Sequence, residues 1–257
     1  FFSFSELKQM KRECAEKLKE KLLNSYRREG KAVKVRNFEN NYNDSPVFSA
    51  MVSNKEQEAE CRANGIEKIY YRQFDVAKES KLNKIDLNSK LVSNLYQILK
   101  SETDKKSVDW NLNIFNNYTV DLFGSFDGVE TVFLSPEMNY EQLKGIKSKI
   151  VKKAMVIYGY LKGMYIEYPI FEKEYKELHG DHNDMYRVVR NGLDNMEIYM
   201  DKPMNLIPKL EDIRKLGLDE LRLDFTFEKP EEVREIIKSL DTEEGKYNPY
   251  CFERGIF

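Results

Sequence analysis

Carboxylate side chains stand at the ends of short apolar runs, and they are the groups of this chain best suited to chemistry. Glu137 follows the run TVFL (131–134), and Asp224 lies inside the run LRLDFTF (221–227). Two carboxylates can hydrolyse a bond together, because one accepts a proton from water while the other donates a proton. Glu137 and Asp224 are therefore the first candidates for a catalytic pair, and no nucleophile is assigned.

Amide and hydroxyl side chains accompany these carboxylates at other expected strand ends. Asn113, Asn116, Ser135 and Tyr158 are candidates for the lining of the same cleft. Further polar residues at such positions are Ser53, Asn54, Arg72, Gln73, Asn111, Asn117 and Glu228. The alternative for each residue is ordinary loop polarity or the capping of a helix, as for Ser135 before Pro136.

The elements that position these side chains are short apolar runs alternating with helical segments. The expected strands are 47–52, 68–71, 110–115, 131–134, 154–158 and 221–227. The expected helices are 55–64, 87–100, 119–126, 140–149 and 230–240. This alternation indicates βα units, a mostly parallel sheet and right-handed crossovers. Since a complete (β/α)₈ barrel has eight strands, we predict an incomplete or distorted α/β barrel with its chemistry at the carboxyl ends of the strands.

The remaining segments define the expected domain organisation. Residues 1–36 form an N-terminal segment with a long amphipathic helix, and the polar residues 37–46 form a linker. The barrel-like domain spans 47–240 and contains a β-hairpin insert near 185–200, where Asn191-Gly192 signals a turn. Residues 241–257 are expected to form an extended tail.

Composition narrows the functional classes. The chain of 257 residues carries a net charge of −2, which argues against broad nonspecific binding of nucleic acid. It contains no apolar run of the roughly 18 residues that a membrane span needs, so no membrane partner is expected. Three scattered cysteines suggest a reducing, cytoplasmic location. No metal site is expected, because His179 and His182 lie in a polar loop.

Basic residues concentrate between residues 8 and 36. Glutamates alternate with them at helical spacing, which is typical of a solvated helix face. The alternative is a contact surface for RNA or a protein partner, with Arg27, Arg28 and Lys31 as its candidate residues.

Several segments resemble the collagenase-like peptidases of peptidase family U-32, and they occur in that family's order. DWNLNIFNN (109–117) is similar to the Asp-x-x-x-Asn-x-Phe-Asn motif, and TVFLSPEMN (131–139) to the Leu-Ser-Pro-Glu-Leu segment. VIYGYLKGMYIEY (156–168) resembles the family's Tyr-Gly-Arg-Leu-Pro segment that ends in Glu-Tyr, and LRLDFTFE (221–228) its final Arg-x-Asp-Phe-x-x-Glu strand. FSELKQMKRE (4–13) resembles the helix before the second half of long members.

The resemblance implies a peptidase acting on a peptide or protein, with Glu167 of the Glu-Tyr pair as a further cleft residue. Other relatives take part in hydroxylating tRNA or ribosomal RNA bases, and several hold an iron–sulfur cluster through cysteines. Here Pro169 stands where relatives have a cysteine, and Tyr160 and Lys162 replace the usual Arg and Pro. A cluster needs about four thiolates, so no iron–sulfur cluster or other cofactor is expected.

Two alternatives to a peptidase remain. The chain would then be a non-catalytic RNA- or partner-binding domain of a base-hydroxylation factor, or a scaffold for a catalytic N-terminal half. Because the chain begins with Phe1 rather than Met, we expect a missing N-terminal domain of the same protein as a partner.

Overall fold

The protein was analysed as a computed structural model, which describes residues 2–27, 37–41, 43, 45–72, 86–168, 177–180, 185–190 and 195–255. It divides into two compact units, Phe1–Asn37 and Phe38–Phe257.

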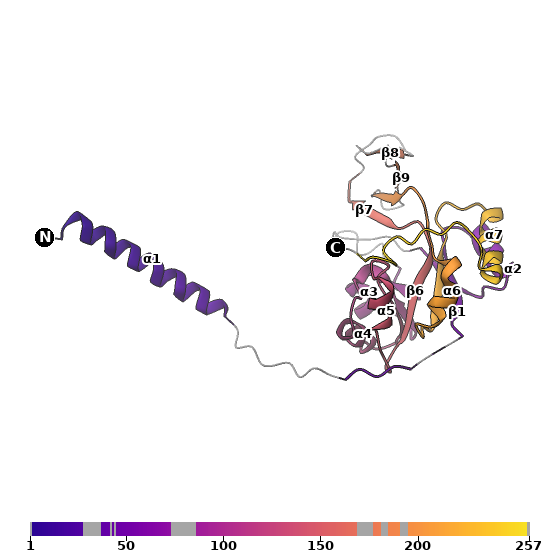
Figure 1. Cartoon of the computed structure of the whole chain (residues 1–257), viewed down its shortest axis with the longest axis horizontal. Coiled ribbons are helices and arrows are strands. Elements are labelled where there is room, and N and C mark those ends of the chain that lie inside the picture. Colours follow the sequence, from indigo (N-terminus) through magenta and orange to yellow (C-terminus); the bar gives the residue numbers. More distant parts are fainter. Residues whose placement is uncertain are drawn as a thin grey trace. The chain divides into compact units, whose positions relative to one another are not determined.

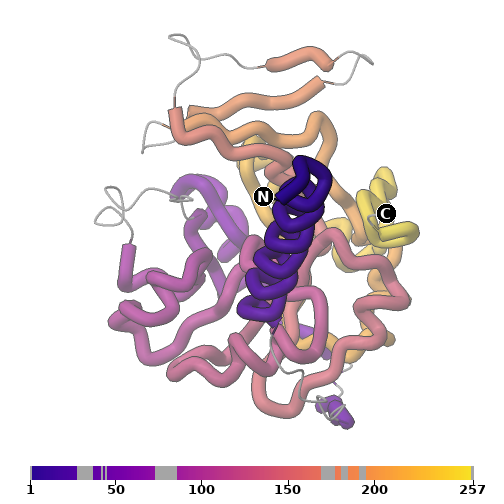
Figure 2. Tube along the Cα trace, turned by 90° about the vertical axis from the view of Figure 1, so that its left-hand side faces the viewer, coloured from indigo at the N-terminus to yellow at the C-terminus, as the bar shows by residue number. Residues whose placement is uncertain are grey.

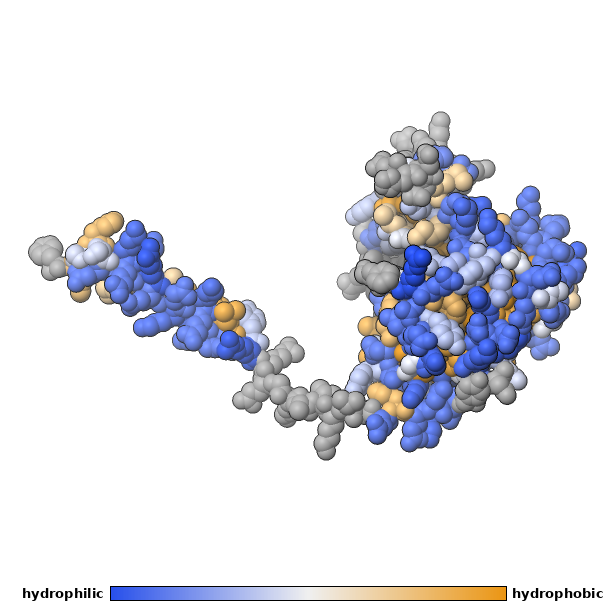
Figure 3. Space-filling view, viewed as in Figure 1, coloured by the Kyte–Doolittle hydropathy of each residue, from blue (hydrophilic) through white to orange (hydrophobic). Residues whose placement is uncertain are grey.

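The first unit contains the long N-terminal helix α1 (Phe4–Tyr26), which confirms the expected helical segment. Ser3 caps it, because the Ser3 hydroxyl accepts the amide hydrogen of Glu6 while the Glu6 carboxylate accepts that of Ser3. No residue of α1 is buried. Figure 3 shows its apolar side chains as separate spots among hydrophilic ones.

The second unit is built around a nearly closed, barrel-like sheet of mostly parallel strands, as the sequence predicts (Figure 1). The strand order is β2-β1-β12-β6-β5-β4-β3, and the short β11 pairs antiparallel with β6. The strands are β1 (Val47–Val52), β2 (Lys68–Tyr71), β3 (Leu91–Val92), β4 (Lys106–Val108), β5 (Val129–Phe133), β6 (Lys152–Gly159), β11 (Met204–Asn205) and β12 (Glu220–Asp224).

Helices cover the outside of this sheet (Figure 1). They are α2 (Lys55–Ala63), α3 (Leu95–Lys100), α4 (Asn117–Gly124), α5 (Tyr140–Lys144), α6 (Leu210–Arg214) and α7 (Pro230–Thr242), with 3₁₀ turns η2 (Trp110–Leu112) and η3 (Ile207–Lys209). The main hydrophobic core lies between sheet and helices, and it includes Leu221 and Leu223 of β12 and Phe225 just after that strand. A second, smaller cluster of Met51, Tyr70, Leu91, Phe133 and Ala154 fills the barrel interior.

A second sheet of four antiparallel strands, here called sheet B, lies at one end of the barrel (Figure 2). Its order is β7-β10-β9-β8, with bounds β7 (Lys162–Ile166), β8 (Glu177–His179), β9 (Met185–Arg190) and β10 (Met196–Met200). The pairing of β9 with β10 confirms the predicted hairpin near 185–200. The predicted turn Asn191-Gly192 lies outside the described residues.

Gly159 joins the barrel to sheet B at the end of β6. Its φ of 149° is uncommon for residues with a side chain, and a Cβ there would lie 2.7 Å from the Asp224 carbonyl oxygen. Glycine thus lets β6 bend closely past the end of β12 before β7 begins.

Two sequence predictions of individual elements are wrong. The predicted strand 110–115 is wrong, because its first residues form the 3₁₀ turn η2. The strand at this point of the sheet is the preceding β4, which has three residues and includes Lys106. The apolar pattern of 110–115 arises from a turn that packs Trp110 and Ile114 on the core. The predicted helix 87–100 contains strand β3 and only the short helix α3.

The ends of the predicted barrel domain also make contacts that the sequence did not indicate. In the predicted linker, Asn40 accepts a hydrogen bond of 2.5 Å from the buried Lys153 amine, and Asn41 donates to the Ser148 carbonyl. In the predicted tail, buried Phe252 accepts the amide hydrogen of Tyr140 at the start of α5. Both segments therefore pack on the barrel where they are described.

Candidate active site

Two groups of carboxylates, each with at least one buried member, lie near the carboxyl ends of the parallel strands. The first group, here called the ion cluster, consists of Asp109 after β4 and of Arg222 and Asp224 on β12. Alternation along β12 places Arg222 and Asp224 on the inner face of the sheet, opposite Leu221 and Leu223. The two inward charges therefore have to be compensated inside the barrel.

Arg222 holds the ion cluster together. Its Nε and Nη2 atoms donate to the two carboxylate oxygens of Asp224 at 2.6 and 3.0 Å, and Nη2 also donates to Asp109 at 2.9 Å. The guanidinium lies 4.1 Å from the ring centre of Phe133. The Arg222 side chain is 0% exposed. This paired, buried arrangement is typical of a structural ion cluster.

Burial and charge compensation act against each other in this cluster. Burial alone would lower the pKa of Arg222, but Asp109 and Asp224 outweigh it and the net shift is upward. Burial is the largest influence on Asp224 and raises its pKa, and the opposing Arg222 charge does not cancel that rise. Arg222 is therefore always charged, and its charge favours an ionised Asp224.

Little space is left above the ion cluster. A cavity of about 30 Å³ separates it from sheet B, and Arg72, Tyr199 and Lys162 lie among the residues around it. Arg72 is engaged there, since it donates to the Thr226 hydroxyl at 2.6 Å and to the Phe225 carbonyl at 3.2 Å. Such a cavity has room for about one water molecule and not for a substrate.

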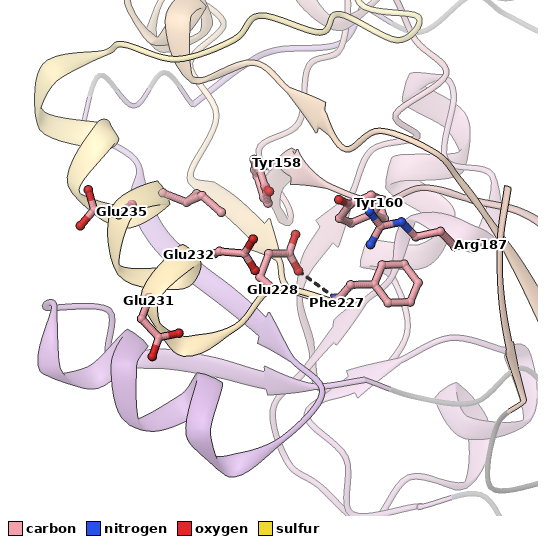
Figure 4. A pocket seen from close by; sticks show the side chains of 9 residues that line it. Tyr158, Tyr160, Arg187, Phe227, Glu228, Glu231, Glu232 and Glu235 are labelled. Carbon is pink, nitrogen blue, oxygen red and sulfur yellow. Dashed lines mark hydrogen bonds between the residues drawn. The ribbon is translucent and has the colours of Figure 1, made fainter. Parts of the chain in front are cut away.

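The second group of carboxylates lines a much larger cavity of about 430 Å³, here called the acidic pocket (Figure 4). Strand β6 and the residue after it supply Tyr158 and Tyr160, and β9 supplies Arg187. The segment after β12 and the beginning of α7 supply the rest, which are Phe227, Glu228, Glu231, Glu232, Glu235 and Ile236. The pocket thus combines four carboxylates with one guanidinium and an aromatic wall.

Glu228 is the most deeply placed carboxylate of this pocket, with 6% of the residue exposed. Its Oε2 atom accepts the backbone amide hydrogens of Thr226 at 2.7 Å and Phe227 at 2.9 Å. The buried Oε1 atom has no hydrogen-bond partner among the described residues. Figure 4 shows the Glu228 and Glu232 side chains directed into the same space.

Burial decides the protonation of the Glu228 carboxyl group. It raises the pKa of Glu228, while the amide hydrogens of residues 226–228 and the nearby Tyr158 hydroxyl act in the opposite direction. Burial and the Glu228 charge in turn raise the pKa of Tyr158, so Tyr158 stays a neutral hydroxyl. A carboxyl group with a raised pKa is suited to donate a proton near neutral pH.

Arg187 closes one side of the acidic pocket. Its guanidinium carbon lies 4.7 Å from the ring centre of Tyr160 and 5.0 Å from that of Phe227. The two rings also meet edge to face at 5.0 Å. This stack joins sheet B to the barrel and fixes the one guanidinium that the described residues contribute to the lining.

The structure places the two predicted catalytic carboxylates in different surroundings. Asp224 bonds to Arg222 inside the barrel. Glu137 lies instead near Cys251 in the C-terminal segment, where burial and then the Glu137 charge raise the pKa of the Cys251 thiol. Asp224 has Asp109, not Glu137, as its acidic neighbour in the ion cluster.

Of the predicted cleft residues, some lie at the ends of helices, one is buried outside the acidic pocket, and one lines that pocket. Asn116 caps α4, Asn113 ends η2 with a left-handed φ of 54°, and buried Ser135 accepts the amide hydrogen of Glu137. Tyr158 does line the acidic pocket. Glu167 is half-buried just after β7 and is not part of the pocket lining.

The predicted contact residues for RNA or a partner lie largely outside the described residues. Arg27 is exposed and ends α1, whereas Arg28 and Lys31 are not described. His179 is exposed on β8, and His182 lies outside the described residues.

The sequence prediction missed most of the acidic pocket. Glu228 was noted as a polar strand-end residue, but Arg187 and the glutamates of α7 were not considered. The available signal was the run Glu228-Lys229-Pro230-Glu231-Glu232, which combines a helix start with three carboxylates. Arg222 had a signal too, because a charged residue between two leucines of a buried strand requires a partner.

Two further searches of the described residues give negative findings. Among those residues, no group of three or more His, Cys, Asp or Glu side chains is arranged to hold a metal ion. No helix in the same ranges is both long and apolar enough to cross a membrane.

Comparison with protein-family models, with curated proteins and with solved structures finds no match to this chain.

Proposed function

We propose that this chain is a hydrolase of the collagenase-like peptidase type that cleaves peptides bound in the acidic pocket. The observation that carries the proposal is Glu228, a buried carboxyl group with a raised pKa that lies beside the Glu232 carboxylate in the lining of a cavity of about 430 Å³. The resemblance of residues 109–117, 131–139, 156–168 and 221–228 to that family supports the same reaction class.

Glu228 and Glu232 would divide the acid and base work between them. Glu232 lies on the exposed first turn of α7 and uses one oxygen to accept the Lys229 amide hydrogen at 2.7 Å. Its other oxygen would accept a proton from a water molecule as that water attacks the peptide carbonyl carbon. Protonated Glu228 would donate its proton to the departing amine nitrogen. The C–N bond of the peptide then breaks, and the new C–O bond to the attacking water oxygen remains.

The two environments support this division of roles. Burial keeps a proton on Glu228 to higher pH, whereas Glu232 is exposed to solvent. Two carboxyl groups in different environments have different pKa values, and in many enzymes this difference decides which group is the acid and which is the base.

The proposal is tested by incubating the purified chain with a mixture of short peptides and following cleavage by mass spectrometry. We expect Glu228→Gln and Glu232→Gln each to lower the rate by about 10²–10⁴-fold, the usual contribution of a general acid or base. Glu211→Gln is the matched control, because Glu211 is 83% exposed on α6 and lies outside the pocket. Cleavage that survives in both pocket variants would overturn the proposal.

The RNA-binding alternative remains a separate prediction. It depends on Arg27, Arg28 and Lys31 and not on the acidic pocket, whose carboxylates would repel phosphate. Salt-dependent RNA binding that is lost on reversing these three charges would favour it, and absence of binding at low salt would exclude it.

A further inference from the structure

We propose that the acidic pocket selects peptides that carry a lysine or arginine side chain, with Glu231 and Glu235 as the residues that recognise the cationic head. This inference rests on the proposed function, because it names the substrate class of the same site. Glu231 and Glu235 are four residues apart on α7, so their side chains lie on one face of the helix. Both line the pocket, and both are exposed at its rim.

The charge of the lining favours a cation. Four carboxylates face one guanidinium, that of Arg187, so the lining carries −3 with all groups ionised and −2 with Glu228 protonated. Glu235 has one ion pair, with Lys238 at 3.2 Å, and both side chains are largely exposed. Exposed ion pairs of this kind contribute little, so Glu235 is available to a ligand.

Stabilisation of the helix accounts for only part of this acidity. Glu231 and Glu232 lie in the first turn of α7, where carboxylates interact favourably with the helix dipole in any protein. Glu235 lies beyond that turn, and Glu228 lies before the helix. The buried Glu228 Oε1, without a partner among the described residues, is directed at the pocket and is the independent sign of a ligand.

Arg187 favours one orientation of the ligand in the pocket. It lies over Tyr160 and Phe227 at one side of the pocket, and the glutamates of α7 lie at the other (Figure 4). A cationic head is repelled by the first side and attracted by the second. The apolar stem of a lysine or arginine side chain would meanwhile contact Ile236 and the aromatic wall.

The size of the pocket is compatible with such a ligand. Its volume of about 430 Å³ falls in the range of about 300–1,000 Å³ that is usual for small-ligand pockets. Figure 3 shows hydrophilic residues over the surface around α6 and α7.

The experiment measures binding without turnover, using the Glu228→Gln chain and calorimetry. The probes are acetyl-Ala-Xaa-Ala-amide peptides in which Xaa is lysine, arginine, norleucine or glutamate. Norleucine keeps the stem of lysine and removes its charge. We expect lysine and arginine peptides to bind about tenfold or more tightly than the norleucine peptide, as for a charge-assisted hydrogen bond. The glutamate peptide should bind weakest.

Variants then assign the recognition to the rim. Introducing Glu231→Gln and Glu235→Gln together should remove most of the preference for lysine over norleucine, while Glu211→Gln should keep it. Circular dichroism checks that each variant is folded. Equal binding of the lysine and norleucine peptides, no binding of either, or an unchanged preference in the rim variant would each overturn the inference.

Failure of the inference and failure of the proposed function give different results. If the chain cleaves peptides but shows no preference for lysine or arginine, the inference is wrong and the proposed function stands. If it binds lysine peptides selectively but cleaves none, the proposed function is wrong and the binding site stands.

Discussion

The ion cluster and the acidic pocket each contain a buried carboxyl group near the same end of the barrel. A neighbouring guanidinium neutralises the negative charge in the ion cluster, whereas Glu228 in the acidic pocket has no such partner among the described residues. Asp109 and Asp224 are compensated by Arg222, which donates three hydrogen bonds to them. Glu228 is almost as buried, yet its partners among the described residues are neutral: backbone amides donate to one of its two oxygens, and the neutral Tyr158 hydroxyl lies nearby. The first arrangement satisfies the barrel interior, and the second leaves a carboxyl group available to a ligand.

The comparison teaches where to look for function on this fold. A buried charge that is neutralised by opposite charges stabilises structure and has little capacity for a substrate, and the cavity of about 30 Å³ beside the ion cluster agrees with that. A buried carboxyl group that lacks a charged partner and borders a large cavity is costly unless a ligand uses it. The predictions below test this difference.

Removing the cation of the ion cluster should have the largest effect. Arg222→Met leaves two buried carboxylates without compensation, and we expect the free energy of unfolding to fall by about 3–5 kcal/mol. Urea denaturation followed by circular dichroism measures this. Arg234→Met is the control, because Arg234 makes an exposed ion pair with Glu60 at 2.6 Å that should contribute at most about 1 kcal/mol. Equal losses in the two variants would contradict the structural role of the ion cluster.

Neutralising one carboxylate in each group should separate them directly. Asp224→Asn weakens two charged hydrogen bonds and should cost about 1.5–3 kcal/mol of unfolding free energy. Glu228→Gln keeps an oxygen for the amide hydrogens of residues 226 and 227 and removes an uncompensated charge. We therefore expect it to leave stability within about 0.5 kcal/mol of the unchanged protein or above it. A larger loss for Glu228→Gln than for Asp224→Asn would reverse the account.

The stack of Arg187 on Tyr160 and Phe227 should contribute a smaller amount. Arg187→Ala removes a cation from two ring faces and should lower the unfolding free energy by about 0.5–2 kcal/mol. Arg187→Lys should recover part of that loss, since lysine keeps the charge without the flat guanidinium. Stability that is the same in all three proteins would show that the stack does not hold sheet B to the barrel.

The pH dependence should show the smallest effect, and its sign follows from the raised pKa of Glu228. The folded chain keeps the Glu228 proton to higher pH than the unfolded chain, whose glutamate titrates near 4.5. Unfolding therefore becomes easier as pH rises from about 4.5 through the folded pKa, and the penalty is constant above it. Glu228→Gln should remove this component in urea denaturation at a series of pH values. Parallel stability profiles for the two proteins would contradict it.

The sequence predicted the architecture better than the site, and particular residues show why. Strand β1 is a nearly continuous apolar run, β12 alternates leucines with charged residues, and α7 has a proline at its first position, so these patterns locate the three elements. Strand β4 is only three residues long and includes a buried lysine, Lys106, which no hydrophobic pattern reveals. The turn after it was therefore predicted to be the strand.

The site depended on contacts between distant segments, which spacing alone does not supply. Asp224 was identified from its place inside a strand, but Asp109, which shares Arg222 with it, is 115 positions earlier in the chain. Tyr158 and Glu228 were both noted, yet only the fold brings them into one pocket with Arg187 from sheet B. Local polarity marked candidate residues, and the crossovers of the sheet decided which of them meet.

The titration of Glu228 tests the central claim most directly. Side-chain carboxyl signals of carbon-13-labelled glutamate can be followed by NMR across pH, with Glu228 assigned by the signal that disappears in Glu228→Gln. We predict a pKa above the usual value near 4.5, which falls when acetyl-Ala-Lys-Ala-amide is added and not when the norleucine peptide is added. A Glu228 carboxyl group that titrates at its ordinary value and is unaffected by the lysine peptide would contradict the account.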